Sequence, residues 1–307
     1  MKKLIFSLLI LTFLVQGSVW AQGNAVKLKC TITDCDGDLK VFQYNGFAFD
    51  EIALAKKINE TVFEISVPKT EEPRAYFIGP DQKDVKSIIL GTESNVSLEG
   101  KCSKMRVAQI KNSPLNEGMD ALRQEIARLR TESIKLARKM RVVKEEEQKQ
   151  EIIDNMAALD AEKMNLLDSL KADNTYYSKT VAMNTYLSFF NHGQNYRGEI
   201  LYFANDYFKY VDFSDEAYNH LPWLTDEIKS FTNTLVRVGL DERSQGMFLD
   251  KIVKKAPEGS MTRQYILSGI IAVCQKEKNS NFIKFGKQYI EEYSEAQPTI
   301  ANTLNQS

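Results

Sequence analysis

The sequence is poor in the residues that most catalytic and metal sites require. Its 307 residues include only two histidines, His192 and His220, and four cysteines. No two cysteines form the Cys-x-x-Cys motif of thioredoxin-type redox sites. A zinc site usually takes about four histidine and cysteine ligands, and two histidines leave little material for one. We therefore predict no enzyme activity, no catalytic residues, no cofactor and no metal ion.

An excess of basic charge is also absent. The formal net charge is −1, and a chain without Lys2 and Lys3 carries −3. Nucleic-acid binding needs a basic surface that neutralises phosphates, so the charge predicts no nucleic-acid partner. After the first residues, no stretch is apolar enough to span a bilayer. We expect a protein partner instead.

The first 21 residues have the pattern of a secretory signal peptide. Lys2 and Lys3 precede an apolar run from Leu4 to Val15. This run is shorter than the roughly 20 residues of a membrane-spanning helix. Val19-Trp20-Ala21 places a small residue where signal peptidase cuts. We predict cleavage after Ala21 and a periplasmic or otherwise exported protein.

Residues 22–112 have the pattern of a β-rich domain. Apolar residues from Val26 to Ile32 alternate with polar ones, which predicts a strand with one exposed face. Asp36-Gly37 predicts a tight turn and a hairpin that returns through Leu39 to Tyr44. Turn residues separate the other expected strands, so we predict an antiparallel sandwich or open barrel. These strands are 52–55, 61–67, 74–78, 85–90, 95–98 and 105–110.

Residues 113–173 are predicted to form a long helical, coiled-coil-like section. They contain one glycine and one proline, and Met119 to Leu129 has the 3-4-3 apolar spacing of a packed helix. The apolar pattern stops over Lys144 to Glu151 and then resumes. One long helix and a helical hairpin both fit. We favour the hairpin, with the charged run at its tip, because a helix of about 80 Å would leave much apolar surface uncovered.

Residues 174–298 are predicted to form an α-helical domain, followed by a loose tail at 299–307. Ser214-Asp215-Glu216 and Thr225-Asp226-Glu227 place acids where the first turn of a helix favours them. Prolines and glycines interrupt the pattern often, which predicts about six short helices. The chain as a whole is therefore expected to be an α+β protein.

Four features are candidate sites. Asp34 to Asp38 holds three carboxylates, but turn chemistry explains this segment better than calcium binding. His192 follows two phenylalanines at an expected helix end, where it interacts with the helix dipole. His220 is expected in a loop. The last is a cluster of aromatic residues, which we interpret mainly as core rather than as a ligand groove. It comprises Tyr196, Tyr202, Phe203, Tyr207, Phe208, Tyr210 and Phe213.

The cysteines are expected to be structural. Cys30 lies on the apolar side of its strand and Cys274 in an apolar helix, so both are expected to be buried. A Cys30–Cys35 bridge does not fit the hairpin, because its Cα atoms must lie roughly 4.4–6.8 Å apart. If a disulfide forms, we expect it between Cys30 and Cys102.

The order of the segments resembles a known family of envelope proteins. The strands at 30–32 and 63–65, the segments 88–93 and 96–100, and Asn112-Ser113 before the helices occur in a familiar succession. They resemble the β domain of unknown function that precedes the thioredoxin module in TlpA-type oxidoreductases of Gram-negative bacteria. Residues 199–203, 213–215 and 221–224 look like the helical domain between the two.

The resemblance implies a compartment and an architecture but no activity, because no Cys-x-x-Cys is present to receive the family's catalytic role. We expect a non-enzymatic exported interaction or scaffold module. The alternatives are an accessory or substrate-presenting partner of a separate thioredoxin-like reductase, and a truncated form of such a reductase.

We expect the purified protein not to accelerate the reduction of insulin disulfides by dithiothreitol, because it has no Cys-x-x-Cys. The rate should equal that of dithiothreitol alone. Turbidity of precipitating insulin measures the reaction. Faster precipitation that disappears with Cys30→Ser would contradict this.

Overall fold

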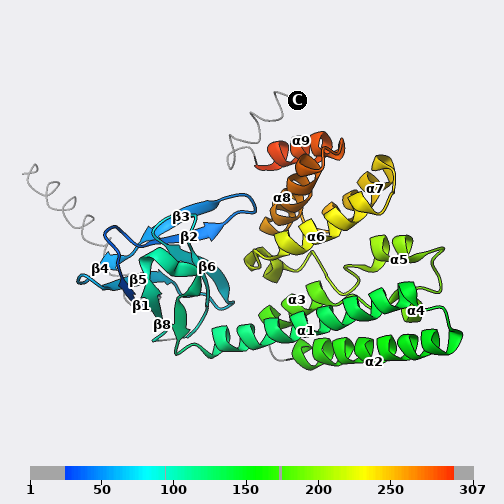
Figure 1. The fold of residues 1–307 in the computed structure, drawn as a ribbon. Coiled ribbons are helices and arrows are strands. Elements are labelled where there is room, and N and C mark those ends of the chain that lie inside the picture. Colours follow the sequence, from blue (N-terminus) through cyan, green and yellow to red (C-terminus); the bar gives the residue numbers. More distant parts are fainter. Residues whose placement is uncertain (1–24, 94, 173–174, 294–307) are drawn as a thin grey trace, which may run out of the picture.

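The computed structural model describes residues 25–293 except 94 and 173–174. Strands form the first part of this range and helices the rest, which confirms the α+β class (Figure 1). The expected signal peptide at 1–21 and the expected tail at 299–307 lie outside the described residues. No described helix is long and apolar enough to cross a membrane.

The β-rich part consists of two sheets that enclose one apolar core. Buried residues of both sheets, including Leu28, Phe63, Val41 and Ile78, belong to this core. The sheets do not close into a barrel. The first has the order β4 (Lys56–Lys57), β5 (Val62–Pro68), β1 (Ala25–Thr33), β8 (Ser97–Lys101), β9 (Gln109–Lys111). The second has the order β3 (Phe49–Leu54), β2 (Lys40–Tyr44), β6 (Arg74–Gly79), β7 (Lys86–Leu90).

The predicted hairpin between the first two strands is wrong. β1 and β2 lie in different sheets, so the segment between them crosses the sandwich. Cys30 on β1 lies opposite Phe63 in antiparallel β5 and Leu98 in parallel β8. The positive φ of this connection belongs to Asp34, at 58°, and not to Gly37. Asp-Gly indicates a turn, but the partner of the returning strand depends on tertiary packing.

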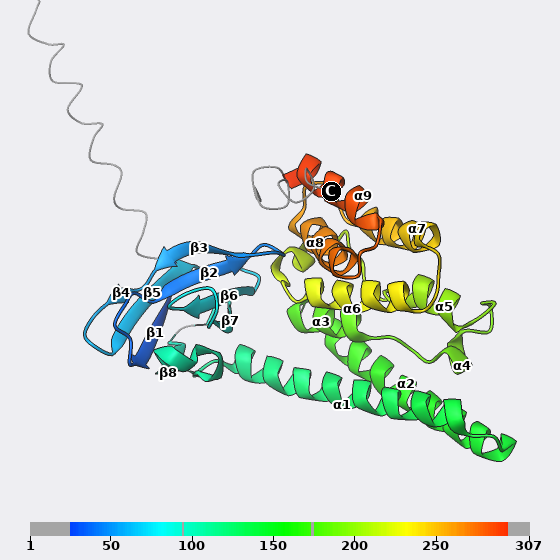
Figure 2. The same cartoon turned by 45° about the horizontal axis from the view of Figure 1, so that its top comes forward.

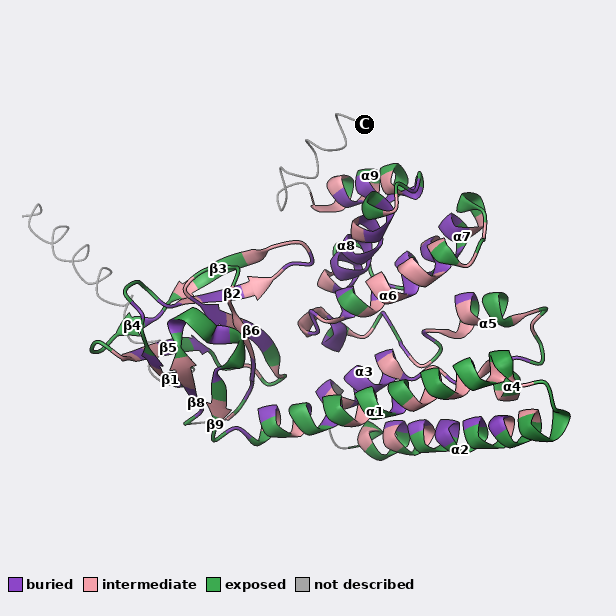
Figure 3. Cartoon of the chain, in the orientation of Figure 1, coloured by how far each residue is buried: buried purple, intermediate pink, exposed green. Residues whose placement is uncertain are grey.

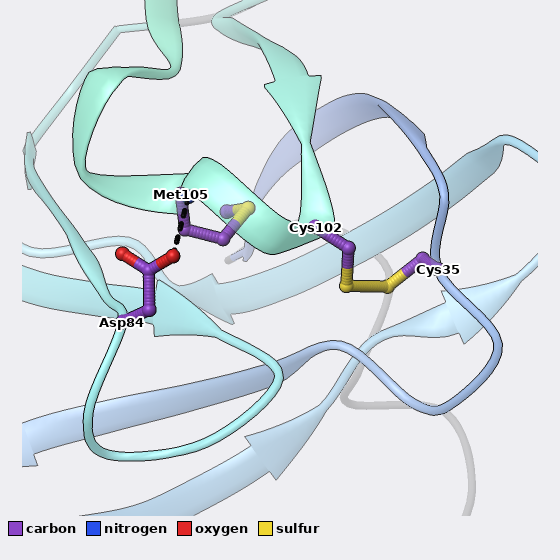
Figure 4. Close-up of a disulfide and its surroundings, with 4 residues drawn as sticks. All are labelled: Cys35, Asp84, Cys102 and Met105. Carbon is purple, nitrogen blue, oxygen red and sulfur yellow. Dashed lines mark hydrogen bonds between the residues drawn. A yellow bond between two sulfur atoms is a disulfide. The ribbon is translucent and has the colours of Figure 1, made fainter.

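The disulfide joins Cys35 to Cys102, which corrects the expected pairing of Cys30 with Cys102. Cys30 is buried and free, and no bridge joins it to Cys35. Cys102 begins the 3-10 helix η1 (Cys102–Val107), which occupies the first half of the predicted strand 105–110. Asp84 holds this helix by accepting a hydrogen bond from the Met105 amide, at 3.0 Å (Figure 4). The cysteines are 67 residues apart, so the chain-entropy model assigns the bridge about 4 kcal/mol.

Residues 114–171 form the helical hairpin that we favoured. α1 (Pro114–Val142) and α2 (Glu146–Lys171) pack together and project as a long arm away from the sandwich (Figure 2). The turn is shorter than expected, because the charged run from Glu146 onward already forms the first turns of α2. Acidic residues in the first turn of a helix interact favourably with the helix dipole. Glu146 and Glu147 therefore begin α2, although the absence of apolar residues here predicts a break between helices.

The remaining described helices pack into a second core. α8 is buried on almost every side, as the colours in Figure 3 show. Cys274 on α8 is fully buried, as expected. The 3-10 helix η2 (Glu216–His220) begins at Asp215, close to its predicted start. The α-helices are α3 (Thr175–Asn184), α4 (Phe189–His192), α5 (Glu199–Asp206), α6 (Leu224–Arg237), α7 (Glu242–Val253), α8 (Met261–Lys276) and α9 (Asn281–Tyr293).

The side chain of Asn116 joins α1 to the edge of the second sheet. Its Oδ1 accepts from the Ile89 amide at 2.9 Å, and its Nδ2 donates to the Ile89 carbonyl at 2.7 Å. Asn116 thus occupies the place that a neighbouring strand would take beside β7. Ser113 caps α1, and its hydroxyl donates to Glu93, which also accepts from the Leu115 amide. The polar side chains of Asn116, Ser113 and Glu93 thus all form hydrogen bonds at this junction.

A second contact joins the β2–β3 connection to α8 and α9. The Tyr265 hydroxyl donates to the Tyr44 carbonyl at 3.1 Å, and the Phe47 ring meets Tyr289 edge to face. Gly46 has a φ of 101°, and a Cβ atom there would lie 2.3 Å from the Ser268 hydroxyl. The two contacts connect the sandwich to both the start and the end of the helical part.

We expect Asn116→Leu to lower the free energy of unfolding by about 2–4 kcal/mol, because it leaves the buried polar groups of Ile89 without partners. Urea denaturation measures this. Asn155→Leu, at an exposed position of α2, is the control and is expected to change stability by less than about 0.5 kcal/mol. Equal effects of the two substitutions would show that the Asn116 pairing does not support the junction.

Candidate functional site

A groove lies between the α1–α2 hairpin and the helices that follow it. It consists of two adjoining cavities of about 260 and 210 Å³. Ser133 and Ile134 of α1, Lys163 of α2 and Tyr186 line both cavities, so the two lie side by side. We call their combined space the interhelical groove. Its total size is within the range of ligand-binding pockets.

The walls of the interhelical groove are largely apolar. Ile134 and Phe190, at 45% and 40% exposure, extend this apolar surface to the solvent. Such exposed large side chains beside a cavity are typical of surfaces that bind other molecules. Ile126, Leu129, Leu166 and Val181 line the first cavity; Met156, Leu159, Leu187 and Phe189 line the second.

A buried ion pair lies in the middle of the groove. Asp160 and Lys163, one turn apart on α2, have 3% and 8% exposure. Lys163 Nζ lies 3.2 Å from Asp160 Oδ1 and donates to the Tyr186 carbonyl at 2.8 Å. Burial lowers the pKa of Lys163, and the negative charge of Asp160 opposes that shift. The pair therefore places a desolvated ammonium group at the boundary of the two cavities.

Asp160 also holds the start of α4. Its Oδ2 accepts from the Ser188 amide at 2.9 Å and from the Ser188 hydroxyl at 2.7 Å. His192 Nε2 lies 3.5 Å from the same oxygen. His192 does end a helix, as predicted, but its carboxylate partner is 32 positions away in the sequence. Local spacing carries no signal for this contact, since the folding of α2 against α4 creates it.

The geometry does not make Ser188 a nucleophile of the triad type. Such a serine gives its proton to a histidine that a carboxylate orients. Here the Ser188 hydroxyl donates to Asp160 and accepts from Asn191 Nδ2 at 2.8 Å. Ser188 and His192 therefore both contact the Asp160 carboxylate and not each other in a relay. This arrangement holds the backbone at Ser188 in place and does not activate its hydroxyl.

The far wall of the first cavity carries a second ion pair. Arg130 Nη1 lies 3.5 Å from Glu227 Oε1, and Arg130 Nη2 donates to the Ser230 hydroxyl at 3.1 Å. The Tyr207 hydroxyl donates to Glu227 at 3.2 Å. Burial raises the pKa of Glu227, and Arg130 opposes that shift. Half of the Arg130 side chain is exposed, so its guanidinium faces the groove and the solvent.

The aromatic cluster is mainly core, in agreement with the expectation for it. Tyr202, Phe208 and Phe213 are buried. Phe208 and Phe213 belong to the helical core, and Phe203 and Tyr210 pack against it. Tyr207 is the member that lines the groove. Tyr186, which stands beside Lys163 and contacts Tyr202, lies outside the predicted cluster although it lines both cavities.

The other candidate residues lie far from the groove lining. Asp34 to Asp38 belongs to the crossing between the sheets, and no metal-binding cluster of histidine, cysteine or acidic residues occurs in the described part of the chain. His220 ends η2 and lines a small cavity beside Arg74; burial and that arginine lower its pKa. Burial raises the pKa of Cys30 and of Cys274 to about 12, which keeps both thiols protonated.

Comparison with protein-family models and with curated proteins found no match to this chain.

We expect Asp160→Asn to lower the free energy of unfolding by about 3–5 kcal/mol, because it leaves a buried ammonium uncompensated. Adding Lys163→Met should recover part of that loss. Urea denaturation of the single and double variants measures both effects.

The control is Asp168→Asn, which removes an exposed pair with Lys171 at the same spacing on α2. It should change stability little, since exposed pairs contribute little. If Asp160→Asn behaves like the control, or if Lys163→Met adds a further loss, the pair is not the constraint described here.

Proposed function

We propose that this protein is a non-enzymatic, exported interaction module whose interhelical groove binds an extended apolar segment of another protein. The observation that carries the proposal is the groove itself. Its two adjoining cavities have largely apolar walls, and Ile134 and Phe190 in these walls are exposed. A few fully buried, well-packed side chains supply most of the affinity of protein interfaces.

Hydroxyl groups in the walls favour a peptide over a purely apolar ligand. The hydroxyls of Ser133, Thr185 and Thr234 each donate to a carbonyl of their own helix, at 2.8, 2.8 and 3.0 Å. Because each hydroxyl proton is used in a hydrogen bond to a backbone carbonyl, the hydroxyl oxygens are left as acceptors for a ligand. The backbone amides of an extended peptide supply matching donors, which an alkyl chain does not.

Two features support export. The pattern of residues 1–21 is that of a signal peptide, and the Cys35–Cys102 disulfide is a bond that oxidising compartments allow to form and persist. The resemblance to the segments that precede the thioredoxin module in TlpA-type envelope proteins points to the same compartment. Within this proposal the protein contributes binding, and any chemistry belongs to its partner.

We expect a fluorescein-labelled peptide ending in Leu-Ala-Phe-Leu to bind the folded protein, and Ile134→Glu to weaken binding by at least about tenfold, because it places a charge on the apolar wall. Fluorescence anisotropy measures the affinity. Met247→Glu is the control, since Met247 is a similarly exposed apolar residue on α7 outside the groove lining. Equal affinities of the two variants, or no binding to the wild type, would contradict the proposal.

A further inference from the structure

The polar groups of the interhelical groove are unequally satisfied. Two acids of the groove, buried Asp160 and partly buried Glu227, each have several partners. Asp160 interacts with Lys163, Ser188 and His192, and Glu227 with Arg130 and Tyr207. A further acid, Glu199, lies at the outer end of the second cavity, where it is solvent-exposed. The carboxylates of Asp160 and Glu227 are therefore already paired and do not require a cationic ligand.

The two cations retain unused donors. Lysine has three N–H donors and arginine five. Among the described residues, Lys163 uses two of its donors, on Asp160 and the Tyr186 carbonyl. Arg130 has one hydrogen bond, to Ser230, and the 3.5 Å contact with Glu227. Both line the first cavity. The hydroxyl oxygens described above line it as well, and as acceptors they suit the backbone amides of a peptide and not its carboxylate.

From this imbalance we propose that the first cavity binds the free C-terminal carboxylate of the peptide, with Arg130 and Lys163 as its donors. The inference rests on the proposed peptide-binding function and specifies which part of a protein enters the groove. Charged donors to a carboxylate form the stronger class of hydrogen bond, and arginine presents them in a planar fork. The last apolar side chains of the peptide then occupy the second cavity.

This arrangement assigns distinct roles to the two cations. Lys163 is 8% exposed and fixed by Asp160, so it is a rigid donor at the cavity floor. Arg130 is half exposed on α1, and its guanidinium can be replaced without opening the core. Arg130 is therefore the position at which carboxylate recognition is tested independently of folding.

The test compares two fluorescein-labelled peptides ending in Leu-Ala-Phe-Leu, one with a free carboxylate and one with a C-terminal amide. We expect the wild-type protein to bind the free acid at least about tenfold more tightly, the factor that one charged hydrogen bond supplies. Arg130→Gln should remove most of this preference, with Lys163 left as the second donor, and should leave the affinity for the amide unchanged. Arg128→Gln is the matched control, because Arg128 has similar exposure on the same helix but does not line the groove.

If the wild type binds acid and amide equally, carboxylate recognition is overturned while peptide binding stands. If the preference for the acid is undiminished in Arg130→Gln, or falls equally in Arg128→Gln, the assignment of Arg130 is overturned. If neither peptide binds to protein whose circular dichroism and unfolding midpoint are intact, the proposed function itself fails.

Discussion

The pairing of Asn116 with Ile89 is the constraint on which the arrangement of this molecule depends. A single side-chain amide satisfies both backbone groups of an edge-strand residue, so the first turn of α1 continues the second sheet. Unpaired strand edges expose a row of hydrogen-bonding groups, and covering the edge with a helix removes part of that liability. Because Asn116 lies three residues after the Ser113 cap, the pairing also fixes the direction in which the α1–α2 hairpin leaves the sandwich. The contact of Tyr44 and Phe47 with α8 and α9 closes the arrangement from the other side.

The interhelical groove follows from this geometry. Once the hairpin is oriented, α3 and α4 pack against it, and Arg130 connects it to α6. Lys163 and Asp160 are buried in this arrangement. A buried ion pair of this kind adds little net stability compared with apolar residues of similar volume, but breaking it is costly. Here it fixes the α2 surface against Ser188 at the start of α4, and it leaves donors facing the space between the helices. A structural constraint and a potential recognition element are thus the same pair of side chains.

Sequence patterns identified more of the fold than of the site. Alternation located most strands of the sandwich, and the 3-4-3 spacing together with the charged run indicated a helical hairpin, because these signals depend on neighbours within one element. The site depends on contacts between elements. Asp160 and His192 belong to no local motif, and Lys163 resembles any other charged residue on a helix. Tyr186 precedes the predicted aromatic cluster, which begins at Tyr196. The disulfide shows the same limit: Cys35 and Cys102 meet because the chain crosses between sheets, whereas the Asp-Gly turn suggested a hairpin.

By itself, the sequence determined the class of the fold, the succession of strands and helices, the burial of Cys30 and Cys274, and the scarcity of histidine and paired cysteine. These properties follow from composition and from periodicities of two and 3.6 residues, which each segment expresses alone. Tertiary structure decided which strands became neighbours, which cysteines joined, and where a lysine and an arginine from different helices line one cavity. Those outcomes arise from long-range packing, in which burial of apolar faces selects one arrangement among several that the local patterns permit.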